Sequence, residues 1–195
     1  MRVSPITMAM LASALMSCSG LPLRGGAPER ALPEIRARSV AEFLDGRATG
    51  LSRAELEQVS RVVVAEADRT GFTPGLIAAL IHVESSGRNF AVSRAGALGL
   101  MQLLPDTARA VALRRGIDWQ GPQMLFDPVI NVRLGIDYLA ELHDRFDSIE
   151  LALAAYNWGP TYIAGLQQRG HPIPRGYTLR VLRYYHQGAR GVGLG

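Results

Sequence analysis

The stretch Leu76-Ile-Ala-Ala-Leu-Ile-His-Val-Glu-Ser-Ser86 has the composition of a buried helix, except that a carboxylate stands near its end. Residues three, four and seven apart share one face of a helix, and Glu84 lies seven residues after Ile77 and four after Leu80. An apolar environment disfavours the ionised form, so it raises the pKa of a carboxyl group and keeps the group protonated. The spacing therefore predicts that Glu84 is a general acid; the alternative is that the helix simply reaches solvent at this residue.

Helix-start and helix-stop signals on both sides of this stretch indicate an all-α domain. Ser52 followed by Glu55 has the pattern of a capping box for a helix to about residue 69, and Thr73-Pro74 begins the helix that carries Glu84. Glycines and a lapse of periodicity mark residues 88–104 as a loop or a minimal hairpin. Further helices are expected over residues 105–115, 127–146, 148–156, 160–168 and 177–187. Because strands do not alternate with these helices, the sequence predicts one all-α domain over residues 51–195.

The N-terminus has the pattern of an export signal. Arg2 precedes an apolar run over residues 6–16, which is too short to span a bilayer as a helix, since that requires about 20 residues. Leu15-Met16-Ser17-Cys18 resembles the lipobox of bacterial lipoproteins, in which signal cleavage leaves a lipidated cysteine at the new N-terminus. We therefore expect a signal peptide over residues 1–17 and a lipid anchor on Cys18, unless this cysteine is there by chance. Ser19 replaces the aspartate that retains many lipoproteins at the inner membrane, so the resemblance favours an exported, periplasmic protein anchored to the outer membrane.

Proline and glycine are frequent in the segment that follows. Residues 18–50 include Pro22, Pro28 and Pro33, which predicts a flexible tether with at most a short helix around residues 39–44. Cys18 is the only cysteine of the chain, so it has no partner for an intramolecular disulfide. The folded domain must therefore depend on its core.

The chain has a formal net charge of +4, carried by arginines scattered along its length. No groove-reading motif accompanies them, and export argues against a nucleic-acid partner. An anionic extracellular polymer fits the charge better, although solvated helix faces account equally well for most of the arginines individually. The histidines lack the spacing of metal ligands, so neither a metal nor another cofactor is expected; they are His82, His143, His171 and His186.

Three separated segments place Glu84 in a larger pattern. Glu84-Ser85, Gly99-Leu100-Met101-Gln102 and Ala155-Tyr156-Asn157 resemble, in order and spacing, the signature of the soluble lytic transglycosylase (SLT) domain, glycoside hydrolase family 23. Leu125-Phe126-Asp127-Pro128 and residues 131–139 are similar to the central helix of that family, and the likeness covers residues 73–187. It implies a lysozyme-like α domain that binds peptidoglycan glycan strands and cleaves the β-1,4 bond between N-acetylmuramic acid and N-acetylglucosamine.

The resemblance also implies roles for individual residues. Glu84 would be the catalytic acid and then the base, and Ser93 matches a serine that the family places near the cleaved sugar. The amide of Gln102 would bind polar groups of the sugar. Met101 would pack on the glycan, unless it only fills the core.

Two tyrosines match the family pattern. Tyr156 would place its hydroxyl beside Glu84 and Asn157 would support it; the alternative for this pair is an ordinary helix end, because Gly159-Pro160 follows. Near the C-terminus the sequence departs from the family, since Pro174-Arg175-Gly176-Tyr177 omits a Glu-Thr pair that many members carry before the last helix. Tyr177 still matches, but the contacts of the missing pair do not carry over.

A single carboxylate at the scissile bond has a consequence for the reaction. Glycosidases that use water or a covalent intermediate ordinarily need a second carboxylate. The family pattern supplies none, and Asp106 and Asp127 have the pattern of helix-start residues. The resemblance therefore implies that the muramic 6-hydroxyl attacks C1 and leaves a 1,6-anhydro end. The alternatives are a lysozyme-type hydrolase of the goose class and a non-catalytic peptidoglycan-binding scaffold.

Overall fold

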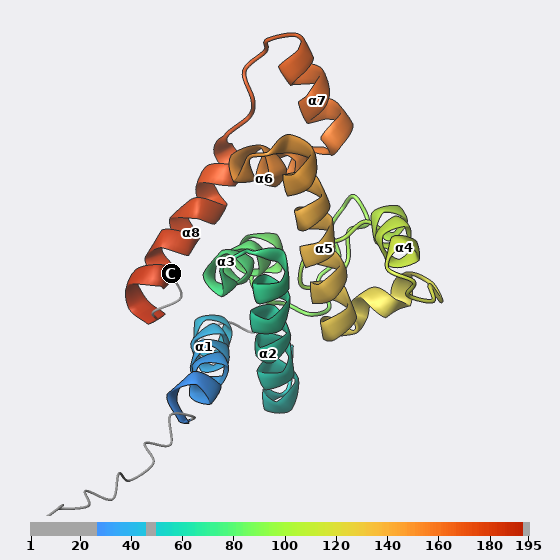
Figure 1. The fold of residues 1–195 in the computed structure, drawn as a ribbon. Coiled ribbons are helices and arrows are strands. Elements are labelled where there is room, and N and C mark those ends of the chain that lie inside the picture. Colours follow the sequence, from blue (N-terminus) through green and yellow to red (C-terminus); the bar gives the residue numbers. More distant parts are fainter. Residues whose placement is uncertain (1–26, 46–49, 193–195) are drawn as a thin grey trace, which may run out of the picture.

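The computed structural model describes residues 27–45 and 50–192, and this part of the chain is built from helices (Figure 1). The helices are α1 (Ala27–Asp45), α2 (Arg53–Thr70), α3 (Pro74–Ser85), α4 (Pro105–Arg114), the 3-10 helix η1 (Pro122–Phe126), α5 (Pro128–Phe146), α6 (Ile149–Trp158), α7 (Pro160–Gln168) and α8 (Gly176–Val192). The β-pairing seen among these residues is confined to isolated bridges of Val92 with Leu98 and of Leu98 with Leu103. The predicted all-α fold is confirmed. The expected signal peptide (residues 1–17) and lipidated Cys18 lie outside the described residues.

The helix starts follow the capping residues expected from the sequence. Ser52 accepts a hydrogen bond from the backbone N–H of Glu55, whose side chain in turn accepts one from the backbone of Ser52. Thr73 accepts a hydrogen bond from the N–H of Leu76, and the carboxylate of Asp127 accepts from the first turn of α5. Each cap satisfies backbone donors that have no partner inside the helix, so it fixes where the helix begins. The described helices are not long and apolar enough for any of them to cross a membrane.

Helix α1 corrects the prediction of a tether over residues 18–50. Residues 27–45 form one helix with Pro33 inside it, not a flexible segment with a short helix around residues 39–44. Ala37, Val40 and Leu44 are buried in the main core, and they recur at the three- and four-residue spacing of a helix face. This apolar face packs on α2, α3 and α8, and burial of that area outweighs the low helix propensity of the surrounding prolines and glycines.

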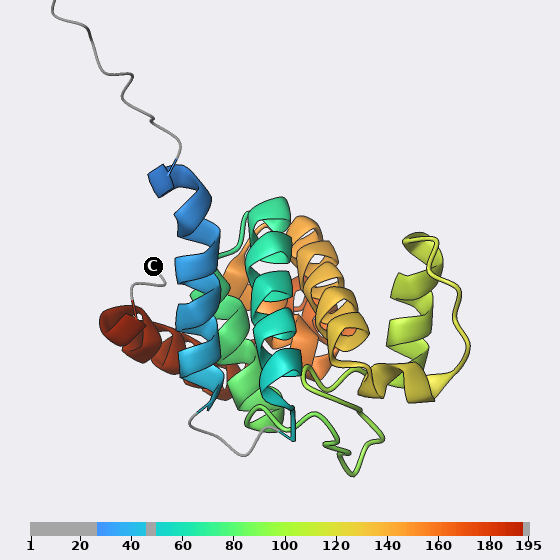
Figure 2. The same cartoon turned by 90° about the horizontal axis from the view of Figure 1, so that it is seen from below.

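Helix α3 lies at the centre of the main core. It packs against α1, α2 and α8, which surround it in both views (Figures 1 and 2). Its residues Leu76 to Ile81 are all buried, so the helix has no solvated face over this length. The long helix α5 packs on α2 and α6 at the other side of the same core. A helix that is apolar all round in this way is fixed by its neighbours, so the residues at its end are held in place.

A second, smaller hydrophobic cluster lies between α4, η1 and α5. Its buried members are Leu103, Ala108, Val111, Ala112, Leu125 and Leu134. In Figure 1 this part of the molecule lies beyond α5 from α2 and α3. It holds the C-terminal half of the loop over residues 88–104 against α5, because Leu103 and, from further within the loop, Leu98 pack on the cluster.

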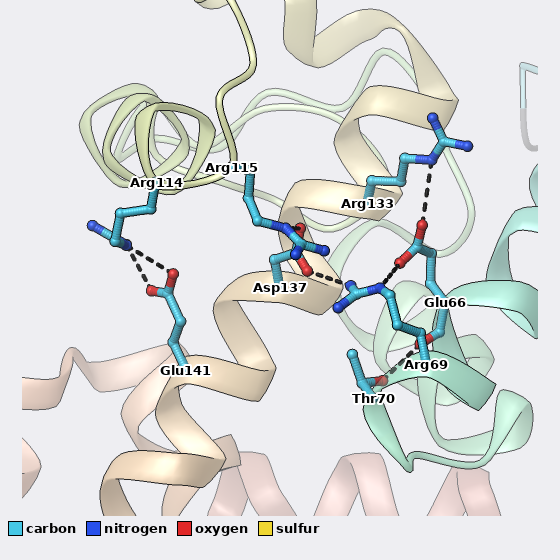
Figure 3. Close-up of polar contacts among 8 residues, drawn as sticks. All are labelled: Glu66, Arg69, Thr70, Arg114, Arg115, Arg133, Asp137 and Glu141. Carbon is cyan, nitrogen blue, oxygen red and sulfur yellow. Dashed lines mark hydrogen bonds and ion pairs between the residues drawn. The ribbon is translucent and has the colours of Figure 1, made fainter.

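Ion pairs tie α2, α4 and α5 together on one side of the molecule (Figure 3). The buried carboxylate of Asp137 on α5 accepts hydrogen bonds from Arg69 at the end of α2 and, at 2.7 Å, from Arg115 just after α4. Arg69 also donates to Glu66 at 2.6 Å. A carboxylate taken out of water needs such charged partners, so Asp137 fastens the end of α2 and the residue after α4 to α5.

Candidate active site

Glu84 stands in the last turn of α3, where the helix ends in a tight turn. Ser86 adopts the left-handed conformation with φ 55° and its N–H donates to the carbonyl of His82, and Gly87 follows with φ 76°. The buried hydroxyl of Ser85 donates to the carbonyl of Ile81 and accepts from the N–H of Gly87. These bonds satisfy backbone N–H and C=O groups that have no partner at the end of the helix, and they hold Glu84 in a fixed orientation relative to the core.

Tyr177 on α8 donates a hydrogen bond from its hydroxyl to Oε1 of Glu84. Burial raises the pKa of Glu84 to about 7, and it outweighs the hydrogen bond from Tyr177 and the positive charge of Arg180, which both lower that pKa. Burial also raises the pKa of Tyr177 well above its usual range, so the phenol remains a donor at all working pH values. Glu84 therefore exchanges its proton near neutral pH, as a group that must act first as an acid and then as a base does.

A cleft of about 600 Å³ opens beside Glu84. It is lined by Gly50, Glu84, Arg88, Asn89, Phe90, Ala91, Val92, Ser93 and Gln102. Glu84 is the one carboxylate among these residues. A second hollow, of about 700 Å³, lies between α1 and α2 and includes none of the site residues expected from the sequence. The cleft with Glu84 is therefore the candidate active site.

The loop over residues 88–104 crosses in front of Glu84 and is held by its own hydrogen bonds. Gln102 adopts a positive φ of 48°, and its side-chain amide donates to the carbonyls of Ala91 at 3.1 Å and Gly99 at 2.9 Å. The hydroxyl of Ser93 accepts from the N–H of Ala97 at 3.0 Å. The structure brings Ser93 and Gln102 to the cleft with Glu84, and in it their side chains shape the loop. Their contact with a sugar stays a prediction.

Asn131 on α5 ties this loop to the helical core. Its side-chain amide donates to the carbonyls of Leu98 and Leu125, each at 3.0 Å, and its carbonyl oxygen accepts from the N–H of Met101 at 2.8 Å. Gly99 lies so close that a Cβ at this position would be 2.3 Å from the amide nitrogen of Asn131. Glycine at position 99 is therefore required both by this approach and by its φ of +79°.

Met101 does not line the cleft, so its predicted contact with the glycan is wrong. The side chain is 0% exposed and packs against Gly135 of α5, where a Cβ would lie 2.8 Å from Cβ of Met101. Leu100 is buried as well. The apolar half of the Gly-Leu-Met-Gln motif fills the core, which was the alternative that the sequence left open.

Tyr156, whose hydroxyl is predicted to lie beside Glu84, makes its hydrogen bond elsewhere. The hydroxyl donates instead to the backbone carbonyl of Met101 at 2.8 Å. The ring is close enough to Glu84 that this charge adds to burial in raising the pKa of Tyr156 well above its usual range. Asn157 is exposed at the end of α6 and makes no side-chain hydrogen bond within the described residues. Tyr156 therefore supports the loop behind Glu84, and Tyr177 is the residue that contacts the carboxyl group.

Tyr177 matched the family pattern in the sequence, but the sequence did not predict that it contacts Glu84. Tyr177 and Val181 lie four residues apart and are both buried on the inner face of α8. Which tyrosine contacts Glu84 depends on the angle and position at which α8 packs on α3. The spacing of apolar residues along one helix does not predict how two helices cross. Within the described residues, no group of three or more His, Cys, Asp or Glu side chains is arranged to hold a metal ion.

Comparison with known families agrees with this geometry. The transglycosylase SLT domain matches residues 61–169, which is more than half of the chain and includes Glu84, the loop over residues 88–104, α5 and α6.

The chain belongs to the transglycosylase SLT family.

Relatives of this SLT domain are known in bacteria. The chain is 38% identical over 109 residues to the membrane-bound lytic murein transglycosylase F of Desulfosudis oleivorans, a match that covers 52% of this chain and 22% of the relative. It is 42% identical over 126 residues to a putative soluble lytic murein transglycosylase of Haemophilus influenzae, covering 56% of this chain and 21% of that protein. The SLT domain thus matches about a fifth of the length of these relatives.

Solved structures show the same lysozyme-like α fold. The lytic transglycosylase Slt of Pseudomonas aeruginosa, in an inactive mutant form, superposes with a TM-score of 0.61 at 30% identity, over 68% of this chain and 24% of that one. The 70 kDa soluble lytic transglycosylase SLT70 of Escherichia coli superposes with a TM-score of 0.63 at 21% identity, over 81% of this chain and 30% of that one. The expected lysozyme-like helical architecture of the SLT domain is confirmed.

Proposed function

We propose that this chain is a lytic transglycosylase that cleaves the β-1,4 bond between N-acetylmuramic acid and N-acetylglucosamine in peptidoglycan and leaves 1,6-anhydro ends. The observation that carries the proposal is the half-buried Glu84, whose pKa is raised to about 7 beside an open cleft. A carboxyl with that pKa is protonated often enough near neutral pH to donate, and ionised often enough to accept.

The lining of the cleft favours attack by the substrate over attack by water. Hydrolases of both stereochemical classes place a second carboxylate about 5–9.5 Å from the acid. The residues that line this cleft include no carboxylate besides Glu84. A nucleophile carried by the sugar itself needs no second carboxylate, because Glu84 can serve in both steps.

The reaction then balances within the substrate. Glu84 donates its proton to the oxygen that joins C1 of N-acetylmuramic acid to C4 of N-acetylglucosamine, and the C1–O bond breaks with its electron pair on that oxygen. The 6-hydroxyl of the same muramic residue forms a bond to C1 and gives its proton to the Glu84 carboxylate. Tyr177 donates to Oε1 of Glu84 and so stabilises the carboxylate between the two steps. No water is consumed, and Glu84 ends in its starting state.

The relatives support the same activity. The matches from D. oleivorans and H. influenzae are named lytic murein transglycosylases. The P. aeruginosa structure is described as an inactive mutant in which a glutamine replaces a glutamate. Loss of activity on that exchange is the behaviour that we expect for Glu84.

We also propose that the mature chain is exported to the periplasm and held at the outer membrane by a lipid on Cys18. The support is the lipobox-like Leu15-Met16-Ser17-Cys18 and the membrane-bound relatives among the matches. Cys18→Ala should abolish fatty-acid labelling and move the protein to the soluble fraction. Labelling that persists in this variant would exclude Cys18 as the anchor.

The test of the activity is the chemical nature of the product. Purified peptidoglycan digested by the chain should yield fragments that end in 1,6-anhydro-N-acetylmuramic acid, lighter by one water than lysozyme products and resistant to borohydride reduction. Glu84→Gln should yield no product, while Glu57→Gln, an exposed change of the same kind on α2, should digest normally. Reducing-end fragments from the wild-type chain would establish a hydrolase instead. Binding without any product over a range of pH and salt would establish a scaffold.

A further inference from the structure

Arg88 lies on the wall of the cleft, four residues after Glu84. It is exposed, and its Nε–H donates to the carbonyl of Ser85 at 3.1 Å. That bond uses one donor of the guanidinium and holds the group at the end of α3. The remaining donors form a planar fork of the kind that binds a carboxylate through two parallel hydrogen bonds.

The charge of Arg88 has no counterpart in the described part of the chain. Other arginines of the fold form ion pairs with carboxylates; these include Arg36, Arg69, Arg114, Arg115 and Arg133. No carboxylate of a described residue forms such a pair with Arg88. Between residues 84 and 104 the only acidic residue is Glu84, and the cation that acts on the pKa of Glu84 is Arg180. Arg88 is therefore not used to tune the catalytic carboxyl.

Apart from Arg88 and Glu84, the groups that line the cleft are neutral. Phe90 and Val92 present apolar surface, and Asn89, Ser93 and Gln102 carry uncharged polar groups. Sugar hydroxyl and acetamide groups are also neutral, so these residues suffice for a glycan chain. The neutral sugars do not require the charge of Arg88, but that charge strongly favours an anionic group that the strand carries beside them.

We propose that Arg88 binds a carboxylate of the stem peptide attached to the muramic residue, so that the chain prefers strands with charged stem peptides. This inference rests on the proposed function, and it adds a specificity that the cleavage chemistry does not require. Stem peptides are the part of peptidoglycan that carries free carboxylates next to the glycan. Arg88 would therefore sense the state of the peptide at the bond that Glu84 cleaves.

The experiment compares two forms of one substrate. Soluble glycan strands with intact stem peptides are used directly, or after their carboxylates have been converted to neutral amides. The chain variants are wild type, Arg88→Gln, Arg88→Lys and Arg109→Gln, an exposed arginine on α4 that does not line the cleft. Each variant is assayed for kcat and KM on both substrates.

Wild type and Arg109→Gln should cleave the charged strands with a kcat/KM about tenfold or more above that for the amidated strands, mostly through KM, since hydrogen bonds to a charged group have about that worth. Arg88→Gln should treat both substrates alike, at the level of wild type on the amidated strands. Arg88→Lys should keep part of the preference. An unchanged preference in Arg88→Gln would overturn the inference and leave the transglycosylase assignment intact.

A binding measurement separates this inference from the activity. Glu84→Gln, with and without Arg88→Gln, is sedimented with insoluble peptidoglycan before and after amidation. Binding by Glu84→Gln should fall on amidation, and the double variant should bind both forms equally. If wild type cleaves neither substrate but this charge dependence holds, the proposed activity fails and the role of Arg88 stands. Binding that ignores both amidation and Arg88 would overturn the role of Arg88.

Discussion

The hydroxyl of Tyr177 donates a hydrogen bond to Oε1 of Glu84, across the packing of α8 on α3. This hydrogen bond thus joins α3 and α8, two helices that are far apart in the sequence. The bond favours the ionised form of Glu84, whereas burial favours the neutral form and has the larger effect. The balance of burial against this hydrogen bond and the positive charge of Arg180 places the pKa of Glu84 at about 7.

Tyr177→Phe should shift the pH dependence of activity upward. The variant loses the hydrogen bond that lowers the pKa of Glu84, so Glu84 stays protonated to a higher pH. A hydrogen bond to a charged group is worth about 1.5–3 kcal/mol, so the alkaline limb of the kcat/KM profile should move by about one to two pH units. Tyr162→Phe, at an exposed ring on α7, is the matched control and should leave the profile in place. An alkaline limb that stays fixed in Tyr177→Phe would show that the phenol does not stabilise the carboxylate.

Glu84→Gln should remove a pH dependence of stability. The folded pKa of about 7 lies above the ordinary value of 4.5 for a glutamate, so the neutral carboxyl contributes its full share of stability below pH 4.5. That share is lost as pH rises toward the folded pKa, at about 1.4 kcal/mol per pH unit. The variant cannot ionise, so it should equal or exceed wild type in free energy of unfolding above pH 7. Denaturant melts from pH 4 to pH 8, with Glu57→Gln as control, measure the difference. A variant clearly less stable than wild type at pH 8 would indicate that Glu84 is held as an ion pair.

Asp137→Asn should lower the free energy of unfolding more than Glu141→Gln, because the two carboxylates differ in burial. The side chain of Asp137 is 8% exposed and serves both Arg69 and Arg115, so its loss leaves Arg115 without a carboxylate and Arg69 with Glu66 alone. Breaking a buried pair costs about 3–5 kcal/mol, and the 40% exposure of each arginine side chain places the expected loss at or below the lower end. Glu141→Gln breaks the exposed pair with Arg114 and should cost less than about 1 kcal/mol. Equal losses in the two variants would mean that burial does not decide the strength of these pairs.

Leu44→Ala tests whether α1 belongs to the folded domain. Leu44 is 1% exposed in the main core, so its truncation should lower the free energy of unfolding by about 2–5 kcal/mol. Leu32 lies on the same helix but is 55% exposed, and Leu32→Ala should change stability by less than about 0.5 kcal/mol. Thermal melts of both variants provide the measurement. If neither substitution lowers the free energy of unfolding appreciably, residues 27–45 are a tether and not part of the folded domain.

The sequence predicted those features that are encoded over a few neighbouring residues. Ser52, Thr73 and Asp127 cap helices where their side chains indicated, because a cap involves only the next three residues. The place of Glu84 on an apolar helix face followed from spacing in the same way. Both are local properties, and tertiary packing did not override them.

Features that depend on contact between distant segments were not predicted. The helical state of residues 27–45 depends on burial against α2, α3 and α8, whereas the prolines within this segment and the glycines around it favoured a flexible tether. The choice between Tyr156 and Tyr177 as the partner of Glu84 depends on the crossing of α8 over α3. The buried state of Met101 depends on Gly135, thirty-four positions later in the chain. Spacing along one segment carries no information on any of these contacts.

The packing of Met101 on Gly135 bears on how degenerate members of the SLT family can be recognised. A gene copy that has lost catalysis but still produces a folded protein remains under pressure to keep Met101, Gly135 and Asn131, because they hold the loop to α5. Glu84 and Tyr177 are released from selection once the reaction is lost. An intact Gly-Leu-Met-Gln motif in a genome survey therefore reports an intact fold, and the glutamate with its phenol partner is what separates a working enzyme from a pseudoenzyme.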